Sequence, residues 1–203
     1  MHQKLTLAAV AVAAALAGVI VASMLSNSDA PTVQSGTILN QPRPIPAFSL
    51  RAHDGSDFAN ADLQGRWSMI FVGFTRCPDI CPATMGVLKN VATQLRESER
   101  DLQVLLLSVD PERDRPEQLA AYVQHFDPEF VGVTADQDEL DKLAKALGFA
   151  FVKVPTDDGD YTIDHTSALM LIDPQARVAG YFTAPHKAAQ IATDLATLIP
   201  ASS

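Results

Sequence analysis

The chain has 203 residues, of which 47% are hydrophobic, so it is long enough for one globular domain with a buried core. Its formal net charge is −9, which argues against nucleic acid as a partner, because binding a phosphate backbone requires clustered lysine and arginine. Acidity of this kind is common among soluble proteins and favours no particular function.

The N-terminal segment gives the clearest indication of compartment. Residues 1–4 carry one positive charge, and the 21 residues 5–25 carry none. At about 1.5 Å per residue, a helix of this length is roughly 30 Å long and matches the hydrocarbon core of a bilayer. We therefore expect residues 1–25 to be an uncleaved anchor in a bacterial inner membrane, with the domain in the periplasm. A cleaved signal peptide is the alternative, although Pro31 follows the best candidate cleavage site, residues 28–30.

Residues 26–47 are polar and contain four prolines, a composition typical of a tether between a membrane and a folded domain. The predicted domain covers residues 48–203. In an exported domain, the cysteines face an oxidising compartment, where a pair of thiols does not stay reduced by default.

Hydrophobic patterning predicts strands that alternate with helices in the first part of this domain. After a small hairpin at residues 48–58, the predicted strands cover residues 67–75, 102–110, 149–155, 167–174 and 176–182, and residues 130–136 are a short strand or a connection. The predicted helices cover residues 82–98, 115–126, 137–148 and 186–199. Residues 156–166 are predicted to be a polar loop. Early alternation followed by a late hairpin indicates an α/β fold with a mixed central sheet flanked by helices.

Both cysteines, Cys77 and Cys81, lie in the stretch GFTRCPDICP at residues 73–82, where a buried strand ends and a helix begins. Residues four apart share a helical face, so both sulfurs can point the same way. A helix N-terminus lowers the pKa of a thiol and the neighbouring Arg76 adds to this, so we expect functional thiols. The pair could be a structural disulfide, a redox couple or part of a metal site. A disulfide that closes so short a loop would stabilise little.

Three motifs together resemble the Sco/SenC family: GFTRCPDICP at residues 73–82, SVDPERDRPEQL at residues 108–119 and DHTSALMLIDP at residues 164–174. The resemblance extends over most of residues 45–200. It implies a thioredoxin-like fold with an N-terminal extension. It also implies a membrane-anchored protein that delivers copper to the dinuclear copper site of cytochrome c oxidase.

The resemblance further implies that Cys77, Cys81 and His165 are the copper ligands. The partners it implies are the copper-bearing subunit of cytochrome c oxidase, other copper chaperones and thiol oxidoreductases. The chain departs from the family pattern at Arg115 and in the residues after Pro174, and both places lie away from the ligands.

The same three residues make chemical sense without the resemblance. Two thiolates and one imidazole form a soft site suited to Cu(I), and a fourth, oxygen-type ligand would allow Cu(II). Among the five histidines, His165 differs because it lies in a loop just before the predicted strand at residues 167–174. Enzymes of thioredoxin fold place a cis-proline against their cysteines at this point. An imidazole in its place would open the sulfurs to a metal.

Three aspartates are candidates for supporting roles around this site. Asp164 could orient the ring of His165 or approach Cu(II), or it could simply be a solvated loop carboxylate. Asp110 ends a strand at the sheet edge where sites gather, but it could equally belong to a turn and a helix cap. Asp79, between the cysteines, could tune a redox potential or contact a partner.

Two functions of different classes are consistent with these residues. The favoured one is a copper metallochaperone, which is not an enzyme, with Cys77 and Cys81 also able to cycle between thiols and a disulfide. The alternative is a membrane-anchored thiol–disulfide reductase that keeps the cysteines of an acceptor protein reduced.

Overall fold

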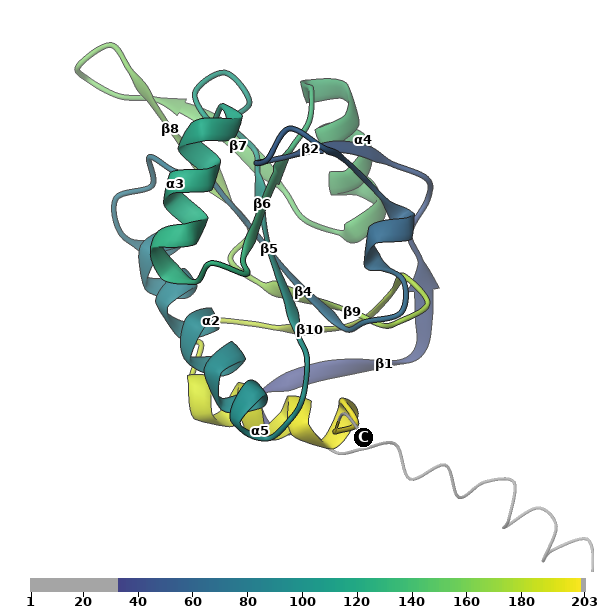
Figure 1. Ribbon diagram of the computed structural model, residues 1–203. Coiled ribbons are helices and arrows are strands. Elements are labelled where there is room, and N and C mark those ends of the chain that lie inside the picture. Colours follow the sequence, from purple (N-terminus) through teal and green to yellow (C-terminus); the bar gives the residue numbers. More distant parts are fainter. Residues whose placement is uncertain (1–32, 202–203) are drawn as a thin grey trace, which may run out of the picture. The chain divides into compact units, whose positions relative to one another are not determined.

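The computed structural model describes residues 33–201 (Figure 1). The predicted anchor and the first part of the predicted tether lie outside the described residues. Within residues 33–201, no helix has both the length and the apolar character needed to cross a membrane.

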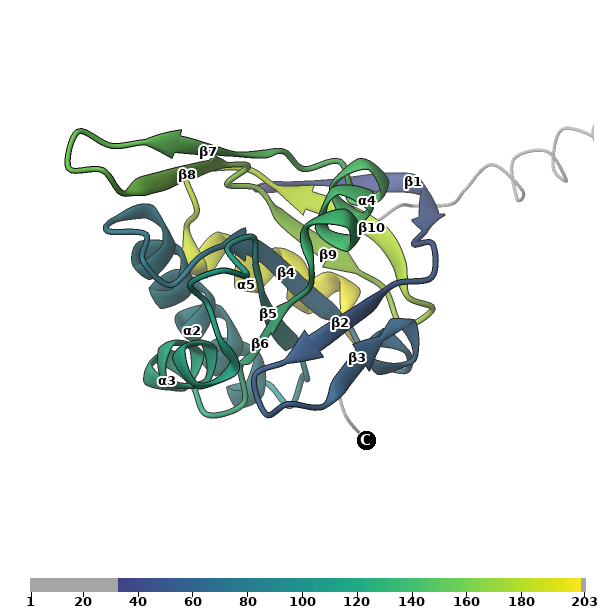
Figure 2. The ribbon, with the colours of Figure 1, turned by 90° about the horizontal axis from the view of Figure 1, so that it is seen from above.

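The centre of the described region is a mixed sheet of eight strands (Figures 1 and 2). Its strands are β1 (Gly36–Pro44), β2 (Ser49–Ala52), β3 (Asp57–Ala59), β4 (Ser68–Gly73), β5 (Gln103–Ser108), β6 (Val131–Thr134), β9 (Leu169–Ile172) and β10 (Arg177–Phe182). They lie in the order β1-β10-β9-β4-β5-β6-β2-β3. β4 and β6 run parallel to β5, and the other pairings are antiparallel. The predicted mixed α/β architecture is therefore confirmed.

The helices cover both faces of this sheet. They are the 3-10 helix η1 (Asn60–Leu63) and the α-helices α2 (Ile80–Glu97), α3 (Pro116–Phe126), α4 (Gln137–Leu147) and α5 (Ala188–Leu198). Helices α2 and α5 pack against each other, and α2 also contacts α3. A Cβ atom added at Gly132 of β6 would meet Leu119 and Val123, which places α3 closely against that face of the sheet.

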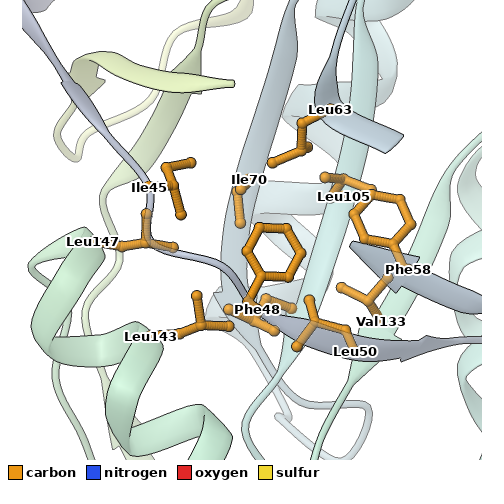
Figure 3. Close-up of a pocket in the computed structure, with 11 residues that line it drawn as sticks. Ile45, Phe48, Leu50, Phe58, Leu63, Ile70, Leu105, Val133, Leu143 and Leu147 are labelled. Carbon is orange, nitrogen blue, oxygen red and sulfur yellow. The ribbon is translucent and has the colours of Figure 1, made fainter. Parts of the chain in front are cut away.

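Helix α4 covers the opposite face, where it closes an apolar layer. Figure 3 shows Leu143 and Leu147 of α4 pointing toward Phe48, and toward Ile70 and Leu105 of the two central strands. Every residue that lines this pocket is apolar. Because no polar group converges there, we assign the pocket to the hydrophobic core and not to a ligand site.

The two predicted hairpins are present. Residues 48–58 form β2 and β3, with Leu50 opposite Phe58, and residues 169–182 form β9 and β10. Period-two burial explains the first of them, since Leu50 and Phe58 are buried while their neighbours Ser49 and Asp57 are exposed.

The segment predicted as a polar loop, residues 156–166, is in part a strand. β8 (Tyr161–His165) pairs antiparallel with β7 (Phe151–Pro155), with Phe151 opposite His165, and the two form a separate two-stranded sheet. The physical reason is that Ile163 is buried while Asp164 is exposed, so the strand alternates. Only the acidic tip of this hairpin behaves as the predicted solvated loop.

The predicted tether also needs correction, because residues 36–44 form β1 and pair with β10 at the edge of the sheet. An edge strand tolerates prolines, since its outward N–H groups need no partner in the sheet. Side-chain contacts hold the start of this segment. The carboxylate of Asp194 accepts hydrogen bonds from the backbone N–H groups of Gln34 and Ser35, at 2.9 and 2.7 Å. The folded domain therefore begins well before residue 48.

Candidate metal centre

The two cysteines lie where β4 passes into α2. Cys77 is in the connection, and Cys81 is in the first turn of the helix, where its backbone N–H donates to Sγ of Cys77 at 3.3 Å. Gly73, the last residue of β4, allows this packing. A Cβ atom there would lie 3.0 Å from Sγ of Cys81, which is tighter than an ordinary contact. Both thiols are buried and free.

A buried carboxylate that the sequence did not single out holds the cysteine-bearing connection in place. Asp114 is fully buried and accepts hydrogen bonds from the backbone N–H and Oγ1 of Thr75, at 2.8 and 2.6 Å, and from Oγ of Ser108 at 2.6 Å. Thr75 is two residues before Cys77. Asp114 therefore fixes the backbone just ahead of the first thiol.

His165 is the last residue of β8, and its ring lies next to the thiol of Cys81. Its ring packs edge-on against Phe71 and Phe74, with centroid separations of 5.9 and 6.0 Å. Nδ1 is 3.1 Å from the carbonyl oxygen of Thr166. Because a carbonyl can only accept, Nδ1 carries the proton, and the lone pair of Nε2 faces Sγ of Cys81 at 3.4 Å.

The electrostatics keep this ring neutral. Burial lowers the pKa of His165 below its ordinary value, and the bond to the Thr166 carbonyl and the nearby Asp164 carboxylate offset the decrease only in part. A neutral imidazole with Nδ1 fixed by a hydrogen bond is the form that binds a metal through Nε2.

The ligand atoms of Cys77, Cys81 and His165 all lie within 4.8 Å of one another. Within residues 33–201 they are the one group of three histidine, cysteine or carboxylate side chains close enough to share an ion. The structure thus brings together the three residues singled out from the sequence. Two sulfurs and one nitrogen form a soft donor set, which favours Cu(I) over hard cations such as Mg²⁺.

The expectation of a lowered thiol pKa is wrong for Cys81. Burial raises the pKa of this thiol well above its ordinary value, and its contact with Cys77 adds to the increase. Arg76 does not counteract this, because its guanidinium is turned to solvent and lies 3.8 Å from the carboxylate of Asp160. Loss of hydration outweighs the helix N-terminus at this site.

The three candidate aspartates have different surroundings. Asp164 is exposed, and the ring of His165 is oriented by the Thr166 carbonyl instead. Asp79 is also exposed and caps α2 only through its backbone carbonyl. Asp110 is fully buried and accepts hydrogen bonds from the side chains of Arg113 and Tyr161, which are described below.

Comparison with known proteins agrees with this geometry. The family model described as SCO1/SenC matches residues 37–200. The human mitochondrial protein SCO1 homolog is 37% identical over 153 residues, which cover 74% of this chain and 51% of the human protein. The match thus spans about half the length of that relative.

Solved structures show the same similarity. The structure of Bradyrhizobium japonicum ScoI with copper bound is 33% identical, with a TM-score of 0.68 over 75% of this chain and 97% of that one. The solution structure of apo Sco1 from Thermus thermophilus is 31% identical, with a TM-score of 0.72 over 84% of this chain and 99% of that one. The described region therefore has the fold of these Sco structures.

Proposed function

This chain belongs to the SCO1/SenC family, and from that premise we propose that it is a copper-binding metallochaperone that supplies the dinuclear copper site of cytochrome c oxidase. The observation that carries the proposal is the convergence of Cys77, Cys81 and His165 within 4.8 Å. Copper is the cargo of such a protein, and its acceptor is the copper-bearing subunit of the oxidase. Other copper chaperones or thiol oxidoreductases would load the site or keep it reduced.

The donor set fits Cu(I) in particular. Thiolates are soft ligands, and the imidazole offers the lone pair of Nε2 without first losing a proton. The raised pKa of Cys81 means that this thiol is protonated before loading, so copper uptake releases its proton.

X-ray absorption of the reduced, copper-loaded protein tests the ligand set. We expect one Cu(I) bound by two sulfurs and one nitrogen. His165→Ala should remove the nitrogen signal and weaken Cu(I) binding by at least about tenfold, because a ligand contributes more than the groups that support it.

His125→Ala is the matched control, since His125 is an exposed histidine on α3. It should leave both the spectrum and the affinity unchanged. If His165→Ala bound copper as tightly as the wild type, with its nitrogen signal intact, the assignment of His165 as a ligand would be wrong.

We also propose that residues 1–25 anchor the protein in a bacterial inner membrane with the domain in the periplasm. Support comes from the 21 uncharged residues after Lys4, because positive charge stays on the cytoplasmic side. A reporter that is active only in the periplasm should be active when fused after Ser203 of the full chain. The fusion should also remain in the membrane fraction. A soluble mature protein that begins near Pro31 would show cleavage and contradict the anchor.

A further inference from the structure

The hairpin that carries His165, formed by β7 and β8, is a sheet separate from the eight-stranded one. β7 and β8 pair with each other and, within the described residues, with no strand of the eight-stranded sheet. Figures 1 and 2 show the tip of this hairpin projecting away from the sheet. Ladder hydrogen bonds therefore do not fix the distance between His165 and the thiols. Apart from the short connection from His165 to Leu169 of β9, it is side-chain contacts that fix it.

Arg113, in the loop between β5 and α3, makes two of the hydrogen bonds that tie the hairpin to the domain. Nη1 of Arg113 donates to Oδ1 of Asp160 and to the carbonyl oxygen of Tyr161, both at 2.9 Å. Its guanidinium carbon lies 3.6 Å from the ring centroid of Tyr161. The Arg113 side chain is only 11% exposed, so solvent weakens these contacts little.

Asp110 completes the contact between this loop and the hairpin. Oδ2 of Asp110 accepts a hydrogen bond from Nε of Arg113 at 2.5 Å, and Oδ1 accepts one from the hydroxyl of Tyr161 at 2.7 Å. The other strand of the hairpin is held as well, because Nζ of Lys153 lies 2.8 Å from Oε1 of Glu112. Both strands are thus tied to residues 110–113.

The same loop also holds the cysteine-bearing connection. Asp114, next to Arg113, binds Thr75 as described above. Arg113 additionally lies 6.0 Å over the ring of Phe74, and Phe74 is one of the two aromatic rings that contact the ring of His165. A single loop therefore contacts both segments that supply the candidate ligands.

We propose that the loop between β5 and α3 sets the position of His165 relative to the two thiols, with Arg113 and Asp110 as positioning residues that act through Tyr161. The proposal rests on the proposed function in so far as His165 binds copper. It assigns a role to the DPERD segment, residues 110–114, that is distinct from binding the metal. We call the contacts of Arg113 and Asp110 with the hairpin the clamp. Loss of the clamp frees the hairpin and withdraws the nitrogen ligand, while both thiols stay in place.

Arg113→Lys tests the clamp because it keeps the positive charge but removes the planar fork that makes several hydrogen bonds and stacks on Tyr161. We expect Cu(I) affinity to fall about tenfold, the loss typical of a group that orients a ligand. The nitrogen contribution to the X-ray absorption should decrease while the sulfur contribution stays. In the metal-free protein, amide hydrogen exchange of residues 161–166 should become faster.

Arg177→Lys is the matched control. Arg177 also binds a buried aspartate, with its Nε 2.8 Å from Oδ2 of Asp173. This pair lies next to Ile172, which is opposite Ser68 at the start of β4, whereas the cysteines follow the end of β4. The control should change neither copper affinity nor hairpin exchange.

A double-mutant cycle separates positioning from general damage to the fold. In a His165→Ala background, Arg113→Lys should change Cu(I) affinity by less than about twofold, since no imidazole remains to be positioned. An equal loss in both backgrounds, or no loss in the wild type, would overturn the proposal. Tyr161→Phe loses only the hydroxyl bonds to Asp110 and Glu112, and it gives the same test in a smaller step should Arg113→Lys fail to fold.

The readouts distinguish the two levels of the proposal. If the wild-type protein binds copper without nitrogen, the ligand assignment fails. The exchange rates of the metal-free hairpin still report on the clamp in that case. If the wild type binds copper through nitrogen but Arg113→Lys alters neither affinity nor exchange, only the clamp fails.

Discussion

Replacing Cys81 with serine is expected to weaken Cu(I) binding by more than about a hundredfold, beyond the loss for any residue that only supports a ligand. The reason is chemical softness, since a hydroxyl is a hard donor that does not replace a thiolate on Cu(I). Cys77→Ser should give a loss of the same order, because each variant leaves one thiolate and one imidazole. Competition with a Cu(I) chelator of known affinity measures the effect.

Stability must be measured beside affinity in these variants. Cys81 is fully buried, so a serine hydroxyl there loses its hydration, at a cost of about 1–3 kcal/mol. Cys81→Ala introduces no such hydroxyl and should also lose copper binding. Loss of copper binding in all three variants therefore separates the ligand role of the thiols from unfolding of the protein. Full affinity in a folded Cys81→Ala protein would show that Cys81 is not a ligand.

The cysteine end of the site could be predicted from the sequence because its pattern is local. The apolar run that becomes β4 is buried at all six positions, and a helical pattern follows it directly. A strand followed at once by a helix places Cys77 and Cys81 at one edge of the sheet without any knowledge of the rest of the chain. The hairpins at residues 48–58 and 169–182 could be predicted for the same reason.

The features that the sequence did not reveal depend on contacts between distant segments. Asp114 reads as one more turn residue, and its role depends on Thr75, which is 39 positions away. The sequence pattern does not indicate β8, because its single buried side chain, Ile163, lies between polar residues next to an acidic turn. The prolines predict a linker as far as residue 47, and this prediction is too long because β1 accepts prolines as an edge strand.

The error in the thiol pKa of Cys81 is one of magnitude. A helix N-terminus stabilises a nearby negative charge by about 0.3–1 kcal/mol, and by up to about 2 kcal/mol when the site is partly buried. Complete burial can shift a pKa by as much as about 3–5 units, and each unit corresponds to 1.36 kcal/mol. Sequence spacing shows the helix terminus but not the depth of the side chain. Burial therefore prevails, and Cys81 remains a protonated thiol until an ion or an oxidant reaches it.

Oxidation of the reduced protein is expected to abolish Cu(I) uptake altogether. The two sulfurs lie within 4.8 Å of each other, so a local adjustment is enough to form a disulfide. Exchange with oxidised glutathione would join the two sulfurs, reduce the glutathione disulfide to two thiols and carry both protons to them. The product has no thiolate to offer, and His165 alone would not retain Cu(I).

Metal analysis after gel filtration should find one copper per reduced protein, none in the oxidised protein, and one again after reduction. The matched control is Cys77→Ser, in which a Cys77–Cys81 bond cannot form, so its residual copper content should not respond to oxidation by this route. The intact mass should decrease by two hydrogens only where copper uptake is lost. If the fully oxidised wild type still took up one Cu(I), the thiolates would not be the ligands. The cysteine pair would then be better explained by the thiol–disulfide reductase alternative, because its redox chemistry would be independent of the metal.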